Sequence, residues 1–181
     1  MTLTVKTPPA DEPVSLEDAK DHLRVDTSAS DAQIAAQIQA ARERAERYLG
    51  RSLVTQTLEL RLDAFPSVID LPRPPIQSVD LIEYIDPDVD TQTLGQFTVD
   101  REGARIIPAA GNDWPRTLAT VNAVTVEYTA GYGGPEDVPQ AIKQAILLTV
   151  ERLYDRPEAN QDRQLAIAGS HLLWPYRQVH V

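Results

Sequence analysis

The chain has 181 residues, of which 42% are hydrophobic, and it carries no cysteine and a net charge of −10 at pH 7. These values predict a soluble globular protein of one domain, or one domain with an insertion, and exclude disulfides and thiolate zinc sites. No apolar run approaches the roughly 20 residues of a membrane helix, and residues 1–13 lack an apolar signal-peptide core, so we expect no membrane partner and a cytoplasmic site of synthesis.

The N-terminal residues 1–14 are predicted to form a loosely ordered arm, because they hold three prolines and no sustained hydrophobic period. A short helix follows this arm. Ser15 supplies a capping hydroxyl and Asp18 a carboxylate three residues later, which is the pattern of a helix start. The helix is expected to end near Leu23.

The second predicted helix has the clearest pattern in the chain. Ser30 and Gln33 predict a capping box at its start, and Gly50 stands where a C-terminal glycine belongs. One apolar stripe recurs at helical spacing: Ile34, Ile38, Ala41, Ala45, Tyr48 and Leu49.

From about residue 55 to 130 the pattern becomes that of antiparallel β strands. Residues 56–62 alternate, with three leucines on one side of the strand. Further strands are predicted at residues 68–71, 79–85, 97–99, 104–107 and 121–128, with a hairpin turn at 100–103. We interpret this region as an insertion between helices that pack together.

Residues 71–79 join two of these strands and contain Pro72, Pro74 and Pro75. Prolines fix φ near −65° and push the preceding residue to extended geometry, so we predict a stiff, extended connector. Arg73 stands between prolines on this stem. The segment is interpreted as a rigid turn or, alternatively, as a contact element presented at a subunit boundary.

The last long helix is predicted to begin near Val138 and to end at Arg156 and Pro157. Its apolar stripe should pack on that of the second helix, so we expect one shared core of Ile38, Ala41, Ala45, Ile142, Ile146, Leu147 and Val150. The fold class is therefore α+β: a small helical bundle over residues 15–155 with an inserted antiparallel β region, followed by an extended C-terminal tail over residues 156–181.

No group of residues carries the pattern of a catalytic, metal or cofactor site. Asp86, Asp88 and Asp90 have the spacing of a calcium loop, but the glycine and the glutamate of that loop are absent, which favours a hairpin loop. The glycines at 131–134 lack the Lys-Ser or Lys-Thr of a phosphate loop. His22, His171 and His180 have no histidine partner at helical spacing, and Ser170 has no nucleophile-elbow sequence around it.

Three arginines recur along one side of the second helix: Arg44, Arg47 and Arg51. Such a row is usually a solvated face. Because it borders the apolar stripe, it is equally consistent with the edge of a subunit interface, paired with acidic residues of a neighbour.

The order of several short motifs resembles that of the head–tail connector proteins, also called adaptor or head-completion proteins, of long-tailed bacteriophages and gene transfer agents. The matching stretches are residues 13–26, 48–57, 71–79, 126–133, 138–148 and 175–177. The resemblance implies a non-enzymatic structural protein of the virion, without cofactor or metal. It implies a helical bundle that assembles, after synthesis in the bacterial host, into a ring, commonly dodecameric, beneath the portal protein.

Such a ring would extend the DNA channel, let DNA pass without specific binding, and offer a surface to the next tail or stopper protein. The subunit interface is then expected to include Arg44, Arg47, Arg51 and Arg73. The apolar tail is expected to order on the portal through Leu172, Leu173, Trp174, Pro175, Tyr176 and Arg177. Two alternatives stay open: a small-molecule or carbohydrate-binding β module, which needs a concave aromatic-lined pocket, and a phage-carried cell-wall hydrolase.

Overall fold

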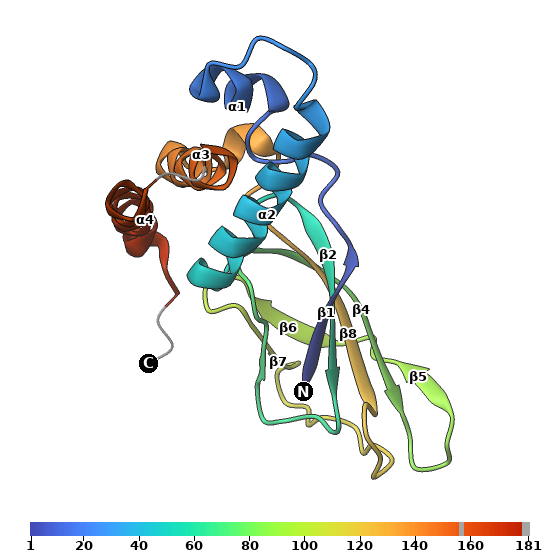
Figure 1. Ribbon diagram of the computed structural model, residues 1–181. Helices are drawn as coiled ribbons and strands as arrows, with labels where there is room; N and C mark the ends of the chain where they lie inside the picture. The colour runs from blue at the N-terminus through green and yellow to red at the C-terminus, as the bar shows by residue number, and fades with distance from the viewer. Residues whose placement is uncertain (156–157, 179–181) are drawn as a thin grey trace. The chain divides into compact units, whose positions relative to one another are not determined.

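The computed structural model describes residues 1–155 and 158–178, and the chain divides into two compact units (Figure 1). Met1–Ala10 and Thr55–Gly131 form one unit, here called the β unit. Asp11–Val54 and the chain from Tyr132 onward form the other, here called the helical unit. The chain therefore crosses between the units at three points.

The β unit contains two antiparallel sheets. The larger has the strand order β1-β2-β8-β4-β5, and the smaller has the order β3-β7-β6. The strands of the larger sheet are β1 (Thr2–Thr7), β2 (Gln56–Leu62), β8 (Val124–Ala130), β4 (Ile76–Ile85) and β5 (Thr91–Thr93). Those of the smaller sheet are β3 (Ile69–Asp70), β7 (Arg105–Pro108) and β6 (Phe97–Asp100).

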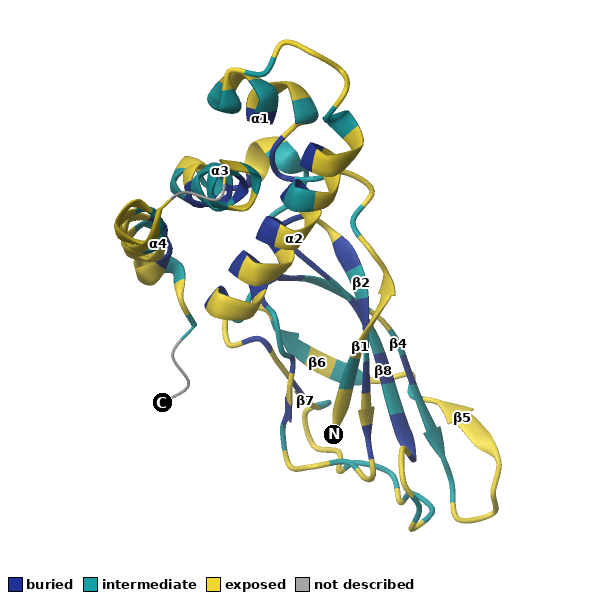
Figure 2. Cartoon of the chain, in the orientation of Figure 1, coloured by how far each residue is buried: buried dark blue, intermediate teal, exposed yellow. Residues whose placement is uncertain are grey.

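Alternation along β2 and β8 places every second side chain in the core of the β unit (Figure 2). Leu58, Leu60, Val126 and Tyr128 are fully buried there, in one cluster with Ile106 of the smaller sheet. Inward-facing residues of both sheets thus form a single core, as the period of two residues requires. Burial raises the pKa of the Tyr128 phenol, whose hydroxyl donates a hydrogen bond of 2.7 Å to the carbonyl oxygen of Pro72.

The helical unit is built from α helices with short 3-10 turns. Its elements are α1 (Leu16–Leu23), α2 (Asp31–Leu49), η1 (Pro135–Asp137), α3 (Gln140–Asp155), α4 (Ala159–Leu173) and η2 (Trp174–Tyr176). The expected shared core of α2 and α3 is confirmed: six of its seven residues are buried together, and Leu147 packs against them partly buried. Within the described residues, none of these helices combines the length and hydropathy needed to span a bilayer.

Two of the three predicted helix signals are confirmed. The Ser15 hydroxyl accepts a hydrogen bond of 3.0 Å from the Asp18 backbone N–H, and Gly50 ends α2 with φ of 67°. The capping box at Ser30 is wrong, because the Ser30 side chain makes no capping hydrogen bond. Its hydroxyl instead accepts a hydrogen bond of 3.3 Å from Tyr154, which ties the start of α2 to the end of α3.

The N-terminal segment is more ordered than its composition suggested. Residues 2–7 form β1, which pairs antiparallel with β2 from Thr2 opposite Arg61 to Thr7 opposite Thr57. The expectation of a loosely ordered arm is therefore wrong for these residues. Five of the six side chains of β1 are exposed, so mainly backbone hydrogen bonds hold the strand. Leu3 and Val5 alternate with polar residues, but two apolar residues are too short a pattern to mark a strand in the sequence.

The proline-rich connector turns at its arginine. Arg73 has φ of 57°, in the left-handed region, so residues 71–79 are not extended throughout as predicted. Arg73 is half-buried, and its positive charge acts on Tyr128 against the effect of burial on the pKa of that phenol. The connector thus leads from β3 in the smaller sheet to β4 in the larger one.

The C-terminal segment is helical instead of extended. Residues expected in an extended tail form α4 and η2, and Leu173 joins the core of the helical unit. The buried or half-buried Leu165, Gly169, Leu172 and Leu173 recur at spacings of three and four residues, which gives α4 one packed face. A Cβ at Gly169 would lie 3.8 Å from the carbonyl oxygen of Ala145, so α4 packs closely on α3.

The predicted fold class is confirmed as α+β with antiparallel sheets and a helical bundle. The domain boundaries stay a prediction. The expected helix end at Arg156 and Pro157, and His180, lie outside the described residues.

Candidate interaction surface

Among the aspartates, glycines, histidines and serine considered above as possible chemical sites, several are explained by structural contacts, beginning with Asp86. Asp86 shapes the hairpin turn between β4 and β5: its carboxylate accepts hydrogen bonds from the Gln92 side chain at 2.9 Å and from two backbone N–H groups at 3.0 Å. These hydrogen bonds, that from Gln92 foremost, lower the pKa of Asp86. The hairpin-loop interpretation is therefore confirmed. No group of three or more His, Cys, Asp or Glu side chains in the described ranges is arranged to hold a metal ion.

The glycine-rich segment after β8 is a tight strand exit. Gly133 has φ of 143°, and a Cβ there would lie 2.1 Å from Oδ2 of Asp137, so only glycine fits. That carboxylate accepts a hydrogen bond of 2.9 Å from the Gly134 N–H. The segment therefore turns the chain into η1 and α3, as the simpler interpretation of its glycines predicts.

Two of the histidine and serine candidates, His22 and Ser170, make contacts within the helical unit. Nε2 of His22 lies 3.0 Å from Oε2 of Glu151, which joins α1 to α3. The Ser170 hydroxyl donates to the Ala166 carbonyl within α4 at 2.8 Å. The first contact holds α1 against α3, whereas the second is a local bond within one helix.

A hollow of about 430 Å³ in the β unit meets part of the requirement for a small-molecule site, since Tyr84 and Trp114 line it. However, Phe65 stacks on Trp114 with ring centroids 4.9 Å apart and meets Tyr84 edge-on at 5.6 Å. The Trp114 indole donates to the Ser67 carbonyl at 3.4 Å. These rings hold the loop after β7 against the sheet.

The three arginines of α2 have different surroundings. Arg44 and Arg47 are exposed, whereas Arg51 is half-buried. The Arg51 guanidinium donates a hydrogen bond of 2.7 Å to the carbonyl oxygen of Tyr176. Arg51 thus holds η2 inside its own subunit, and only Arg44 and Arg47 are available to a neighbour.

The C-terminal segment is anchored to the end of α2 at three points. Besides the Arg51 hydrogen bond, the Gln178 N–H donates to the Leu49 carbonyl at 2.9 Å, and the Arg177 guanidinium lies 5.5 Å from the centre of the Tyr48 ring. Near this junction burial raises the pKa of Tyr132, opposed by the charge of Arg51. The described part of the segment is therefore a packed part of the helical unit.

This packing divides the six residues expected to dock on the portal. Leu173 is buried in the core, and Leu172 and Tyr176 pack against it. Trp174, by contrast, is 69% exposed, and Pro175 and Arg177 are exposed beside it. Ile167 is 48% exposed and lies seven residues before Trp174, hence on the same side of α4. We call Ile167, the exposed His171 between them and Trp174 the α4 ridge.

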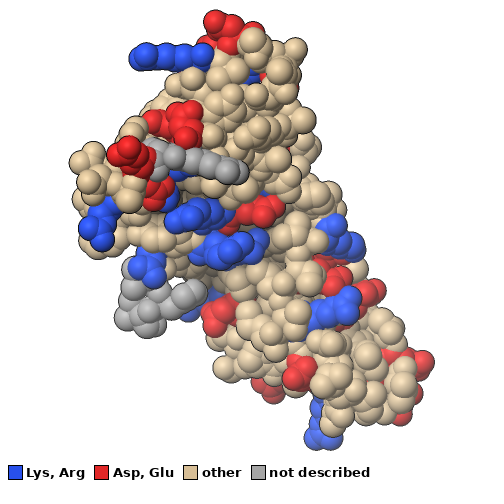
Figure 3. All heavy atoms as spheres, viewed as in Figure 1, with Lys and Arg blue, Asp and Glu red and all other residues tan. Residues whose placement is uncertain are grey.

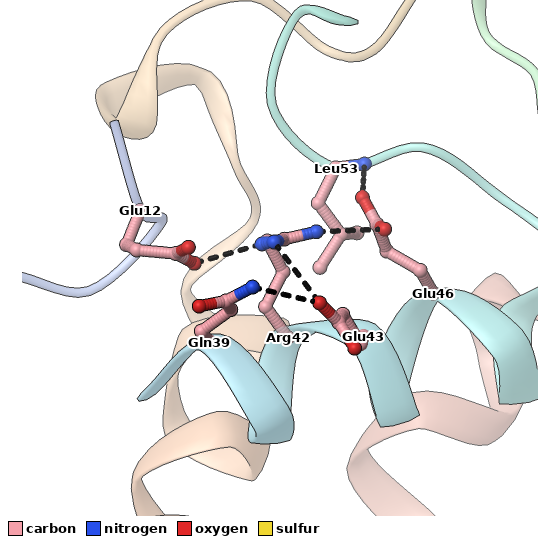
Figure 4. A network of polar contacts seen from close by, with 6 residues as sticks. All are labelled: Glu12, Gln39, Arg42, Glu43, Glu46 and Leu53. Carbon is pink, nitrogen blue, oxygen red and sulfur yellow. Dashed lines mark hydrogen bonds and ion pairs between the residues drawn. The ribbon is translucent and has the colours of Figure 1, made fainter. Parts of the chain in front are cut away.

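Sequence reasoning missed a buried ion cluster on the opposite flank of α2 (Figure 4). The Arg42 side chain is 6% exposed and donates to Glu12 at 2.8 Å and to Glu46 at 3.1 Å. Glu46, with 3% of its side chain exposed, also accepts from the Leu53 N–H at 3.0 Å. Burial acts to lower the pKa of Arg42, but the hydrogen bond to Glu12 and the neighbouring carboxylates outweigh it and raise that pKa.

Beside this cluster lies a groove of about 520 Å³, here called the acidic groove. The bottom of the groove is apolar and includes the buried side chains of Val14 and Ile38. The charged residues of its lining are four carboxylates and one lysine: Asp11, Glu12, Asp18, Glu136 and Lys143. Elsewhere on the helical unit, Figure 3 shows Lys and Arg close to Asp and Glu over the helices on the face in view.

Comparison with known proteins finds one matching family and several solved structures of the same fold. A family model described as head completion protein matches residues 12–169. No curated protein matches the chain. A chain from the virion of a native gene transfer agent (GTA) particle superposes with a TM-score of 0.82 at 22% identity. A chain from the neck of an empty GTA particle computed with C6 symmetry has a TM-score of 0.80 at 24% identity. A chain from the neck of a native GTA particle computed with C12 symmetry has a TM-score of 0.79 at 22% identity. Each match covers 100% of this chain and 97% of the other.

Proposed function

Because the chain belongs to the head completion protein family, we propose that it is a structural subunit of the head–tail junction of a phage or gene transfer agent particle. Copies of the chain form a ring beneath the portal, extend the DNA channel and offer a docking surface to the next tail or stopper protein. The subunit acts by its surfaces and catalyses no reaction.

The observation that carries this proposal is the likeness of fold over the full length of the chain to subunits of GTA necks. One of those necks was computed with C12 symmetry, which supports a ring of twelve. A ring requires two different patches on each subunit, because its interfaces are head-to-tail. The helical unit has two candidates of opposite character, the exposed arginines of α2 and the acidic groove.

The α4 ridge is the surface proposed to meet the portal. An exposed tryptophan beside an exposed isoleucine is a typical anchor of an interface, since aromatic side chains contribute much of the binding energy. Pro175 and Arg177 flank it, whereas Leu172, Leu173 and Tyr176 support it from the core side. Deleting the whole segment would therefore disturb the core, and point substitutions on the ridge are the sharper test.

We expect the purified protein to bind isolated portal rings, and Trp174→Ala to weaken this binding at least about tenfold while the protein stays folded. Sedimentation of the mixture measures the complex. Val121→Ala is the matched control, because Val121 is 73% exposed and lies in the β unit. A wild-type protein that never associates with portal rings would contradict the proposed function. Undiminished binding by Trp174→Ala would contradict only the assignment of the α4 ridge.

We also expect weak affinity for DNA. With a net charge of −10 the protein offers few phosphate contacts, so fluorescence anisotropy with a duplex should show no complex at about 10 μM protein and physiological salt. A channel wall of this kind lets DNA slide. Tight binding with a steep dependence on salt would show that a basic surface grips the DNA, against this prediction.

A further inference from the structure

The proposed ring leaves open which surface of the neighbouring copy receives the exposed arginines of α2. Arg44 and Arg47 are exposed, and within the described residues neither forms an ion pair of 4 Å or less in its own chain. Arg44 does act on Asp162, where its charge adds to the hydrogen bond from Arg152 in lowering the pKa of that carboxyl. The acidic groove offers a complementary surface: an apolar floor with carboxylates around it.

Two of these carboxylates are available to a neighbour. Asp11 and Glu136 are exposed, and neither forms an ion pair within the described parts of the chain. Glu12 is engaged with Arg42 at 2.8 Å, and the Asp18 carboxylate accepts a hydrogen bond of 2.7 Å from the Ser15 hydroxyl at the start of α1. Lys143 is the single cation of the groove lining, so the groove keeps a net negative charge.

The geometry of α2 places the two surfaces on opposite flanks of the helical unit. Ala35 and Ile38 line the acidic groove. Arg44 and Arg47 follow them by nine residues each, which is about two and a half turns at 3.6 residues per turn. Each arginine therefore points about half a turn away from the corresponding groove residue. Patches on opposite flanks of one rigid helix are what a head-to-tail contact between identical copies requires.

We propose that the acidic groove of one copy receives the Arg44–Arg47 side of α2 from the next copy, with Asp11 and Glu136 as the partners of these arginines. This assignment rests on the proposed ring and names its contact. Tyr48, which is 37% exposed and adjoins Arg47, supplies apolar surface toward the groove floor with the part of its ring that the Arg177 guanidinium leaves uncovered. The arginine side is positive and the groove negative, so their attraction also fixes which surfaces meet.

A charge swap tests the contact. Arg47→Glu places a like charge at every interface of the ring, so the protein concentration for half-maximal ring formation should rise at least about tenfold. Glu136→Lys should have a similar effect. The double variant Arg47→Glu/Glu136→Lys restores opposite charges and should recover most of the loss. Ring formation, alone and on portal rings, is measured by analytical ultracentrifugation, and thermal unfolding checks that each variant is folded.

The chain offers a matched control pair. Arg101 and Glu102 are exposed neighbours in the turn between β6 and β7, outside the helical unit. Arg101→Glu and Glu102→Lys make the same charge changes and should leave ring formation within about twofold of wild type. Asp11→Lys is the second acidic variant, should Glu136→Lys fail to fold.

The outcomes separate this proposal from the function on which it rests. If the wild-type protein forms no ring with or without the portal, both fail. If it forms rings and Arg47→Glu assembles equally well, the groove contact is overturned while the connector function stands. If both single variants lose assembly and the double variant recovers nothing, the two charges do not face each other, and the assignment of partners is also overturned.

Discussion

Replacing Arg42 with Met should lower the free energy of unfolding by about 3–5 kcal/mol. The Arg42 guanidinium is buried between Glu12 and Glu46, with hydrogen bonds of 2.8 Å and 3.1 Å. Methionine fills a similar space but removes the positive charge that is paired with buried Glu46. Most of the loss in stability comes from the carboxylate that stays buried without this ion pair. Urea denaturation followed by circular dichroism measures the change, with a constant m-value as the check for two-state unfolding.

Two further variants make this result specific. Arg42→Met/Glu46→Gln removes both charges and keeps an oxygen for the Leu53 N–H, so it should recover a large part of the lost stability. Arg47→Met changes an exposed arginine of the same helix and should shift the free energy by less than about 0.5 kcal/mol. A loss below about 1 kcal/mol for Arg42→Met would show that the ion cluster adds little to the helical unit.

Replacing Ile146 with Ala should cost about 2–5 kcal/mol of unfolding free energy. Ile146 has no exposed surface and lies where α3 packs on α2, in one core cluster with Ile38 and Ala41. The substitution removes three buried carbon atoms and leaves a cavity that rigid helices fill only in part. The same denaturation measurement applies, and Ile146→Val should cost about 0.5–1.5 kcal/mol.

Ile167→Ala is the matched control for this prediction. It is the same substitution on the neighbouring helix α4, at a side chain that is 48% exposed. Its effect on stability should be small, because water already reaches much of that side chain. Equal losses for Ile146→Ala and Ile167→Ala would mean that α3 does not form the centre of the helical core.

The sequence was most informative where one face of an element is buried. The stripe of α2 and the alternation of β2 both predicted their elements, and the observed bounds Asp31–Leu49 and Gln56–Leu62 agree with them. Gly50 marked the end of α2 because the left-handed cap there favours glycine. When one face of an element is buried, its apolar residues recur in the sequence at the period of that element. The intrinsic helix or strand propensities of the residues leave no such periodic pattern.

Two strands with few buried side chains escaped prediction, and so did the helix α4. The side chains of β5 are all exposed, and in β1 only Leu3 is partly buried, so these strands are held mainly by backbone pairing. α4 was hidden by the proline at 157 and by the polar residues at its start. Its apolar positions Leu172 and Leu173 follow Leu165 by seven and eight residues, about two helical turns, and this spacing is the sequence signal for α4.

The buried ion cluster escaped for a different reason. Arg42 and Glu46 are charged and four residues apart, the usual pattern of a solvated helix surface. Their positions could have revealed them, since Arg42 lies four residues after Ile38 and three before Ala45, within the apolar stripe. For the proposed interaction surfaces, sequence patterns predicted the arginines but not the acidic groove, whose residues come from four separate segments of the chain.

The three crossings between the units have a consequence for the order in which the protein folds during translation. The β unit interrupts the helical unit, so the 77 residues of Thr55–Gly131 emerge from the ribosome between α2 and its partner α3. At about 5–20 residues per second, the ribosome needs roughly 4–15 s for them. During that interval the apolar stripe of α2 has only α1 to cover it, whereas β2 can already pair with β1. The nascent chain therefore exposes the apolar stripe of α2 for seconds, and that is when a chaperone is most useful to it.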